Sequence, residues 1–306
     1  MLKKVHLFFL GASVFIGNLT AYEFAIATMF QDEAPYFKEW IEYHMMVGAE
    51  HFWLYDNDSQ DNAAEILQPY IEKGIVEVIP WSEPLCGADK AEGFPATLQV
   101  KMVRDAITRA KGQAKWIAVI DIDEFILPKK DKTVPECLKN HFSGAQAVFA
   151  SWLNFGTSGV YIPKGDPIIC ELTACAMKSH PKNGNGKSIW RPEEVDLDSI
   201  HWVHWARLKP GAEYRNGDGT PVIMEGEGAN WDWDYHDKYI RINHYFLRDE
   251  NFFQGKRLAL AQKGAGAYSE KVLWEFYDLL SRQKDRTMKN FVKTQHPDKY
   301  KEFWEK

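Results

Sequence analysis

The feature that most constrains the fold is an apolar run that ends in two aspartates, Trp116 to Ile120 followed by Asp121-Ile122-Asp123. Five consecutive apolar residues rich in β-branched side chains are typical of a strand buried on both faces of a parallel sheet. Because side chains alternate along a strand, we expect Asp121 and Asp123 to project to the same side. Open α/β sheets bind ligands at the carboxyl ends of their strands, so both carboxylates are predicted to face a ligand cleft.

Paired aspartates at such a position predict a divalent metal site. Carboxylate oxygens are hard ligands that suit Mn²⁺ or Mg²⁺, with the remaining positions left to water and a diphosphate. The alternative is a solvated acidic turn, because an Asp-X-Asp triplet alone is a weak signal. Its place directly after a buried strand favours the metal site.

The first half of the chain alternates apolar strands with helical patterns. The expected strands cover 24–29, 51–55, 75–79 and 116–120, and the expected helices cover 35–48, 61–74 and 95–111. This alternation predicts an α/β fold whose mostly parallel sheet is flanked by helices and connected by right-handed crossovers.

The second half is less regular. Strand-like pieces occur at 147–153, 168–177 and 239–243, candidate linkers at 180–187 and 213–228, and a charged helical pattern at 269–306. Clusters of Gly, Asn and Pro separate the strand-like pieces. We therefore expect an α+β portion beside the main sheet and a helical C-terminal segment.

Composition excludes two classes of function. With 306 residues, a net charge of −6 and no basic stripe, the chain is not expected to bind nucleic acid. The four cysteines, Cys86, Cys137, Cys170 and Cys175, show neither a CxxC motif nor zinc spacing, which argues against a zinc site. Cys170 and Cys175 form either a disulfide or two buried thiols. Of the 12 tryptophans, most are expected in the core and one or two at a site.

The N-terminus predicts a targeting signal. Lys3 and Lys4 precede an apolar stretch that is short for a membrane span, and Leu19-Thr20-Ala21 resembles a cleavage site. A cleaved signal peptide over 1–21 is the first interpretation and a short anchor the second. We therefore expect a secreted or membrane-associated protein, with a tether that leaves the domain in the cytoplasm as an alternative.

Three further features carry chemistry. Asp56 directly follows the second expected strand, where an acid can accept hydrogen bonds from a nucleoside, although a turn is the alternative. His244 follows an apolar strand and could add an imidazole ligand to the aspartate pair; a structural histidine is the alternative. Trp152 and Gly156 lie where a strand enters a glycine-punctuated loop, which suits a ligand contact or a plain hairpin.

Taken in order, these motifs resemble a GT-A glycosyltransferase, in particular glycosyltransferase family 92 and its family-2-like bacterial relatives. The similarity spans 23–256 and is carried by FAIATMFQDEAPYFKEWIEYHMMVG, HFWLYDNDSQD, Gln99, WIAVIDIDEFI, SWLNFGTSG, KSIWRPEEV with His201 downstream, and INHYFLRDENFFQGK. The resemblance implies an inverting hexosyltransferase that moves a sugar, often galactose, from a nucleotide diphosphate sugar such as a UDP-sugar to a glycan.

The resemblance also implies roles for individual residues. The metal would be bound by Asp121, Asp123 and His244. The donor would be bound by Asp32, Asp56, Gln99 and Asp121. The donor sugar or the acceptor would be bordered by Trp152, Phe155 and Gly156. For the general base, Asp232 and Glu194 lie at suitable distances beyond the Asp-X-Asp triplet; Asp232 is our candidate, and ordinary surface acids are the alternative.

The expected domains follow from the same comparison. A transferase domain covers 22–268, with a nucleotide-sugar half at 22–128 and an acceptor half at 129–268, and the helical segment follows at 269–306. Two other functions stay open. A secreted glycoside hydrolase would explain the signal peptide, and a non-catalytic carbohydrate-binding protein would explain the tryptophans.

Overall fold

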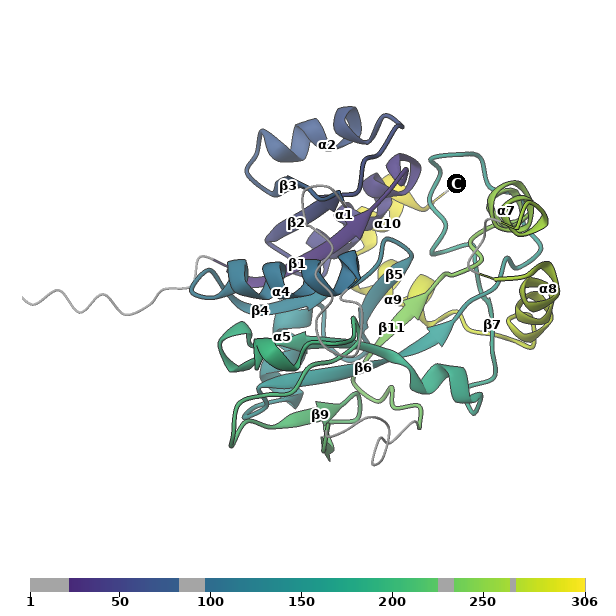
Figure 1. Ribbon diagram of the computed structural model, residues 1–306. Coiled ribbons are helices and arrows are strands. Elements are labelled where there is room, and N and C mark those ends of the chain that lie inside the picture. Colours follow the sequence, from purple (N-terminus) through teal and green to yellow (C-terminus); the bar gives the residue numbers. More distant parts are fainter. Residues whose placement is uncertain (1–21, 83–96, 225–233, 265–267, 306) are drawn as a thin grey trace, which may run out of the picture.

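The computed structural model describes residues 22–82, 97–224, 234–264 and 268–305 (Figure 1). The predicted signal segment at 1–21 lies outside them. Within the described residues, no helix combines the length and the apolar composition needed to cross a bilayer.

The first half of the chain builds the parallel part of a ten-stranded sheet. Its strands are β1 (Tyr22–Phe30), β2 (His51–Asp56), β3 (Val76–Pro80) and β4 (Ala114–Val119), and its helices are α1 (Ala34–Met46), α2 (Ala63–Ile71) and α4 (Leu98–Ala110). The strands lie in the order β3-β2-β1-β4, and all three pairs are parallel. The predicted α/β class and the predicted strands of this half are confirmed.

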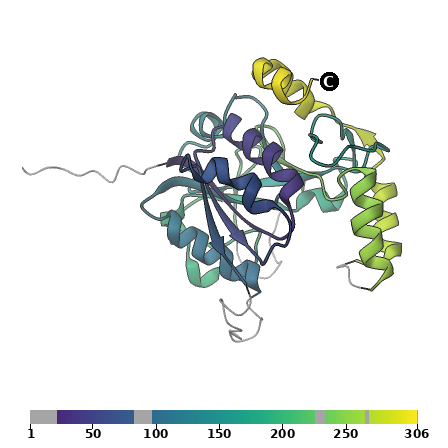
Figure 2. The same ribbon diagram turned by 90° about the horizontal axis from the view of Figure 1, so that it is seen from above.

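Both faces of this part of the sheet are buried, as the apolar runs predict. Phe24 and Ile26 of β1 belong to the hydrophobic cluster that contains the inner faces of α1 and α2. Ala25 and Ala27 belong to the cluster that contains α4. Figure 2 shows the two groups of helices on opposite sides of the strands.

The second half extends the same sheet with mixed strands. They are β6 (Ala147–Asn154), β8 (Gly186–Trp190), β9 (Tyr214–Asn216) and β10 (Pro221–Val222), in the order β10-β9-β6-β8-β4. β8 is antiparallel to both β4 and β6. A ladder of β5 (Glu124–Pro128) with β11 (Ile240–His244) joins β6 through β11.

The predicted linkers at 180–187 and 213–228 are wrong where the structure describes them, because β8 begins inside the first at Gly186 and both β9 and β10 lie inside the second. Residues 225–228 lie outside the described residues. The glycine content that suggested a linker has a packing cause. A Cβ atom on Gly186 would lie within bonding range of the Ala150 carbonyl oxygen on the neighbouring strand β6. Only glycine allows that approach.

The strand expected at 168–177 is also mostly wrong. Only β7 (Ala174–Cys175) is extended, and it pairs with β12 (Gln283–Lys284). The backbone N–H groups of Ile168 and Ile169 donate instead to the buried carboxylate of Glu39 in α1, so this segment needs no strand partner. Cys170 and Cys175 are free buried thiols.

The remaining elements are short. They are α5 (Val134–His141), α6 (Glu250–Phe252), a π-helical turn (Phe253–Leu258), α7 (Ala259–Gln262), α8 (Glu270–Leu279), α9 (Thr287–Gln295), α10 (Pro297–Phe303), and 3₁₀ turns at Pro181–Gly184, Pro192–Glu194 and Leu197–Ser199. The helical C-terminal segment is confirmed, and it packs on the core because the indole N–H of Trp304 donates to Glu39.

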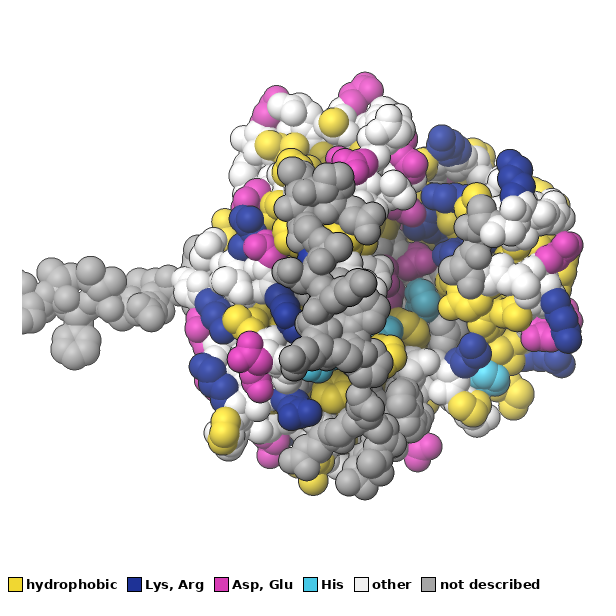
Figure 3. Space-filling model, viewed as in Figure 1, with side chains coloured by type: hydrophobic (Ala, Val, Ile, Leu, Met, Phe, Trp, Pro, Cys, Tyr) yellow, Lys and Arg dark blue, Asp and Glu magenta, His cyan; other side chains and the backbone are white. Residues whose placement is uncertain are grey.

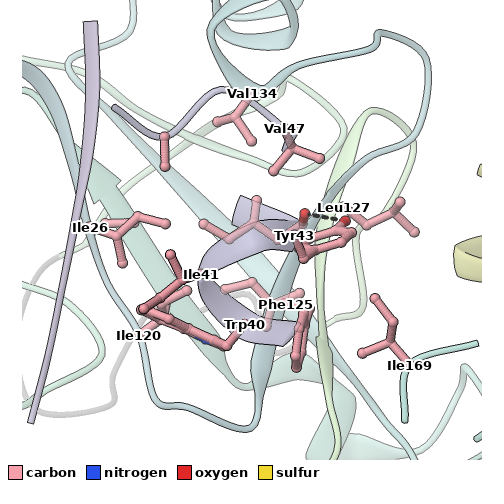
Figure 4. Close-up of a cluster of buried hydrophobic side chains, with 14 of the residues drawn as sticks. Ile26, Trp40, Ile41, Tyr43, Val47, Ile120, Phe125, Leu127, Val134 and Ile169 are labelled. Atoms are coloured by element: carbon pink, nitrogen blue, oxygen red, sulfur yellow. Dashed lines mark hydrogen bonds between the residues drawn. The ribbon is translucent and has the colours of Figure 1, made fainter. Parts of the chain in front are cut away.

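Helix α1 packs against β5, the strand that follows the carboxyl end of β4. Trp40 and Tyr43 of α1 pack beside Phe125 and Leu127 of β5 (Figure 4). The Tyr43 hydroxyl donates to the Ile126 carbonyl at 2.8 Å. The residues that follow β4 are therefore held from the helix side as well as by the strands.

Candidate functional site

The two aspartates lie in a tight turn between β4 and β5. β4 ends at Val119, and the N–H of Glu124 donates to the Asp121 carbonyl at 3.0 Å, which closes the turn. The expectation that Asp121 and Asp123 share one side of a continuing strand is wrong, because the strand has already ended. The side chain of Asp121 is 44% exposed and that of Asp123 is 11% exposed.

The turn is held by buried groups. The indole N–H of Trp40 donates to the carbonyls of Asp121 (3.2 Å) and Glu124 (3.0 Å). The Glu124 carboxylate accepts from the Asp121 N–H, and the Tyr245 N–H donates to the Asp123 carbonyl at 2.8 Å. A side chain on this turn therefore keeps a fixed position, as a preorganised site requires.

Asp121 pairs with a buried lysine that the sequence analysis missed. Lys187 of β8 places its Nζ 3.1 Å from Asp121 Oδ2 and 3.9 Å from Glu124 Oε1. Burial alone would lower the pKa of Lys187, but the two carboxylates outweigh it and raise that pKa. Burial raises the pKa of Glu124 well above its usual value, although Lys187 acts against this. The ammonium group therefore faces Asp121 as a charged partner.

Asp123 faces the predicted histidine. His244 Nε2 lies 3.6 Å from Asp123 Oδ1, at the end of β11. The Asn154 side chain donates from Nδ2 to Asn183 Oδ1 at 2.9 Å, so its Oδ1 is the acceptor that lies 2.9 Å from His244 Nδ1. His244 thus donates from Nδ1 to Asn154, and Nε2 is the ring atom that faces the carboxylate. Burial lowers the pKa of His244, and the Asp123 carboxylate acts in the opposite direction.

In its neutral form His244 offers the Nε2 lone pair beside the Asp123 carboxylate, and a divalent cation can bind both groups. Around a small divalent cation with ligand bonds of about 2.1 Å, neighbouring ligand atoms lie about 3 Å apart, close to the spacing of Asp123 and His244. The described residues contain no group of three His, Cys, Asp or Glu side chains that could hold a metal. Asp123 and His244 are the pair whose spacing suits a shared cation, and Asp121, which pairs with Lys187 through Oδ2, adds its negative charge beside His244.

Two arginines, Arg248 and Arg257, add positive charge near the Asp123 carboxylate. Arg257 Nη2, presented by the π-helical turn, lies 3.6 Å from Asp123 Oδ2. Arg248 is buried, adopts a positive φ of 52°, and pairs with Glu33 at 2.6 Å. Burial would raise the pKa of Asp123, but the imidazole and guanidinium groups around it outweigh burial and lower it. Figure 3 shows acidic and histidine side chains at the base of a hollow with basic side chains beside it.

The predicted nucleoside residues lie together at the ends of β1 and β2. Asp56 Oδ1 accepts from the Ser59 N–H at 2.9 Å, the turn contact that was the alternative to nucleoside binding. Asp32 has a positive φ of 55° and accepts from the Gln60 N–H at 2.7 Å. Gln99 is exposed in the first turn of α4. The structure thus brings Asp32 and Asp56 into one loop pair, and their role in donor binding stays a prediction.

Of the predicted sugar-lining residues, one lies in the site. The ring of Trp152 is 4.4 Å from that of His244. Phe155 is 1% exposed and packs against Tyr245, so its ring supports the core rather than a ligand. A Cβ on Gly156 would lie 2.8 Å from the Leu280 carbonyl oxygen, so this glycine admits backbone and not a sugar.

Of the two candidates for the general base, the structure describes only Glu194. Asp232 lies outside the described residues. Glu194 follows β8, which runs antiparallel to β4, so it lies near the start of β4 and far from Asp121. The contact from the Gly112 N–H to Glu193 confirms that position. Glu194 is therefore excluded as the base.

The functional residues that sequence reasoning missed are basic. Lys187, Arg248 and Arg257 all lie within the quoted motifs KSIWRPEEV and INHYFLRDENFFQGK or directly after them. A signal was present in the second motif, because Arg248 and Arg257 follow the His-Tyr pair at three and twelve positions beyond Tyr245. Lys187 gave none, because it adjoins a glycine-rich stretch that is typical of exposed loops.

Comparisons with known proteins agree with the motifs. The model of glycosyltransferase family 92 matches residues 21–219. A family 92 protein of Ricinus communis is 27% identical over 237 residues, which are 75% of this chain and 40% of that protein. Galactan beta-1,4-galactosyltransferase GALS2 of Arabidopsis thaliana is 35% identical over 92 residues, 29% of this chain and 17% of that protein. The chain spans less than half the length of these relatives.

Two solved structures show a distant likeness. TarS of S. aureus (residues 1–349) has a TM-score of 0.35 and 11% identity, covering 93% of this chain and 75% of that one. Glucosyl-3-phosphoglycerate synthase of Mycobacterium tuberculosis, in complex with Mn²⁺, UDP and glucosyl-3-phosphoglycerate, has a TM-score of 0.27 and 13% identity, covering 43% and 44%. No residue role is carried over from either structure.

The family match extends over most of the described sheet, from β1 to β9, and includes the aspartate turn and Lys187. The chain belongs to glycosyltransferase family 92.

Proposed function

We propose that this protein is a metal-dependent hexosyltransferase that moves a sugar from a nucleotide diphosphate sugar to a hydroxyl group of a glycan or glycoconjugate. The observation that carries the proposal is the approach of His244 Nε2 to the Asp123 carboxylate, 3.6 Å apart at the carboxyl end of the parallel strands, with Nδ1 of the same ring held by Asn154. Family membership supports the reaction class. Two of the relatives, GALS2 and GALS3 of Arabidopsis thaliana, are named galactan beta-1,4-galactosyltransferases, so galactose is the first sugar to test.

Asp123 and His244 would hold Mn²⁺ or Mg²⁺. When bound, such a cation neutralises charge on the diphosphate of the donor. Asn154 keeps His244 in the tautomer that can ligate, which is the usual role of a residue behind a metal-bound histidine.

The basic residues would act on the leaving group. When an acceptor hydroxyl attacks the anomeric carbon, the bond to the diphosphate breaks and negative charge develops on the departing nucleotide. Arg257 lies beside Asp123 and is 27% exposed, so its guanidinium can meet that charge. Lys187 keeps Asp121 in place from the buried side.

The stereochemical course and the base remain parts of the proposal. A single displacement inverts the anomeric centre and needs one group that removes the proton of the acceptor hydroxyl. Asp232 is our candidate for that group. The N-terminal 21 residues are proposed to direct the domain to a membrane or to secretion.

A screen of nucleotide sugars tests the function. Release of UDP from UDP-galactose, UDP-glucose and UDP-N-acetylglucosamine is measured with Mn²⁺ and with EDTA. We expect release from at least one donor with Mn²⁺ and none with EDTA. Metal-independent cleavage of a glycan would support the hydrolase instead, and glycan binding without any donor turnover would support the binding protein.

A further inference from the structure

A small pocket opens beside His244. Its volume is 110 Å³, and aromatic rings from three parts of the chain line it: Trp152, Phe246, Tyr268 and Phe276. We call it the aromatic pocket. Phe276 belongs to α8 and Tyr268 lies directly before it, so the C-terminal segment forms one wall.

The size of the aromatic pocket suits one sugar ring. Its volume of 110 Å³ is several times the roughly 10–15 Å³ that one water needs, which is the scale of a single small ring rather than of an extended chain.

The rings form a connected apolar wall. The Phe246 ring centroid lies 5.5 Å from that of Tyr268 and 5.6 Å from that of Phe276, in edge-to-face contacts. Tyr268 is 40% exposed, although an isolated large aromatic side chain gains by burial. Aromatic faces stack on the C–H surface of a sugar, and the exposed tyrosine face offers such a surface.

Polar groups stand at the opposite wall. The indole Nε1 of Trp152 is buried and has no hydrogen-bond partner in the part of the chain that the structure describes. His180 Nδ1 accepts from the Lys182 N–H, so its Nε2 carries a proton and can donate. A buried donor without a partner is unfavourable, and a sugar hydroxyl would satisfy it.

We propose that the aromatic pocket binds the terminal sugar ring of the acceptor, and that α8 thereby contributes to acceptor choice. The inference rests on the proposed transferase function. The pocket touches the site through His244 and Trp152, and the Arg257 guanidinium stacks on its Phe246 ring at 4.0 Å. An acceptor ring in this pocket would thus lie directly beside the reaction centre. α8 lies beyond the residues that the family model matches.

Saturation-transfer NMR tests the pocket directly. The probes are methyl β-galactopyranoside, methyl β-glucopyranoside, methyl α-mannopyranoside and a β-1,4-linked galactobioside, each with the full chain, UDP and Mg²⁺, which is diamagnetic. We expect transfer to the ring C–H protons of at least one probe. In Phe276→Ala and Tyr268→Ala, the dissociation constant of that probe should rise about tenfold, in line with the loss of one aromatic contact.

Trp274→Ala is the matched control. Trp274 is an exposed aromatic on the same helix, but it packs against Phe253 and Tyr277 outside the pocket. Probe affinity should not change in this variant, and the melting temperature and UDP affinity of all three variants report their folding.

Two results would overturn the pocket. One is the absence of transfer to every probe in a wild-type protein that releases UDP from its donor. The other is an equal loss of affinity in Trp274→Ala and Phe276→Ala. A wild-type protein that turns over no donor would instead count against the proposed function, so the two failures are distinguishable.

Discussion

The donor side and the acceptor side of the proposed site consist of different kinds of side chain: charged and hydrogen-bonded groups on the first, aromatic rings on the second. On the donor side, three separate elements hold the aspartate turn. Lys187 on β8 and Arg257 on the π-helical turn are ionic partners, and Trp40 on α1 donates a buried hydrogen bond. On the acceptor side, the aromatic pocket is made of rings, one of them 40% exposed. Charge positioning demands rigidity, whereas a sugar contact tolerates exchange of one ring for another. We therefore expect donor-side changes to abolish turnover and acceptor-side changes to alter preference.

Asp123→Asn should have the largest effect. The amide keeps the size of the side chain but removes the charge that a divalent cation needs, so we expect UDP release to fall by about a thousandfold or more. Steady-state assays with saturating Mn²⁺ measure this, and thermal melting checks the fold. Turnover within tenfold of wild type would remove Asp123 from the site.

Lys187→Met distinguishes the contribution of the Lys187 ion pairs to stability from their contribution to turnover. Asp121 can be solvated because it is 44% exposed, but Glu124 is buried, so we expect a loss of about 1–3 kcal/mol of stability. Turnover should fall about 10- to 100-fold because Asp121 loses its partner. Chemical denaturation and donor hydrolysis give the two numbers. A variant with wild-type stability would show that the ion pair carries no structural weight.

Trp40→Phe sharpens the comparison further. Phenylalanine fills most of the space but leaves the carbonyls of Asp121 and Glu124 without their buried donor. We expect about 1–2 kcal/mol of destabilisation and about a tenfold loss of turnover from a looser turn. Probe binding in the aromatic pocket should change little. If pocket binding fell as far as turnover, the two sides would not be independent.

His44 should have the smallest effect on turnover at neutral pH, because it acts on the pH dependence of stability. Its Nδ1 bonds the Trp40 carbonyl and its Nε2 accepts from the Ile126 N–H, and burial lowers its pKa to about 3. Between that value and the ordinary value near 6.5, the unfolded chain binds the proton and the folded chain does not. Stability from this group is therefore present above pH 6.5 and is lost as the pH falls, by up to about 1.4 kcal/mol per pH unit.

Comparing the pH dependence of stability in His44→Gln with that in the wild-type protein isolates the contribution of His44. Other titrating groups, including Glu39, whose pKa burial raises to about 7, act equally in both proteins. Denaturation at pH 4, 5 and 6 should show a shallower loss of stability in the variant. Parallel curves would mean that His44 is protonated in the fold.

The donor side could be predicted further from the sequence than the acceptor side. The strands of the parallel half, and the place of Asp121 and Asp123 just after β4, follow from apolar runs and helical periodicity, which are local patterns. Lys187 could not be predicted, because its burial depends on β8 lying between β4 and β6, a long-range pairing that a glycine-rich segment conceals. Phe155 was misplaced for the same reason, since only the fold decides which aromatic residues face a pocket.

The ligand set shows the same limit. Strand alternation suggested two aspartates acting together, but the early end of β4 divides them, with Asp121 turned to Lys187 and Asp123 to His244. No local pattern encodes where a strand stops to within two residues. The aromatic wall from α8 is equally invisible in sequence, because it joins positions about 120 residues apart, as for Trp152 and Phe276.

Direct measurement of Mn²⁺ affinity by calorimetry in the presence of UDP tests the central claim. Wild-type protein should bind one Mn²⁺, and Asp123→Asn and His244→Gln should each weaken binding by at least tenfold, with a smaller effect for Asp121→Asn. If Mn²⁺ binds both variants as tightly as wild type, the cation does not lie between Asp123 and His244, and the account of the site is wrong.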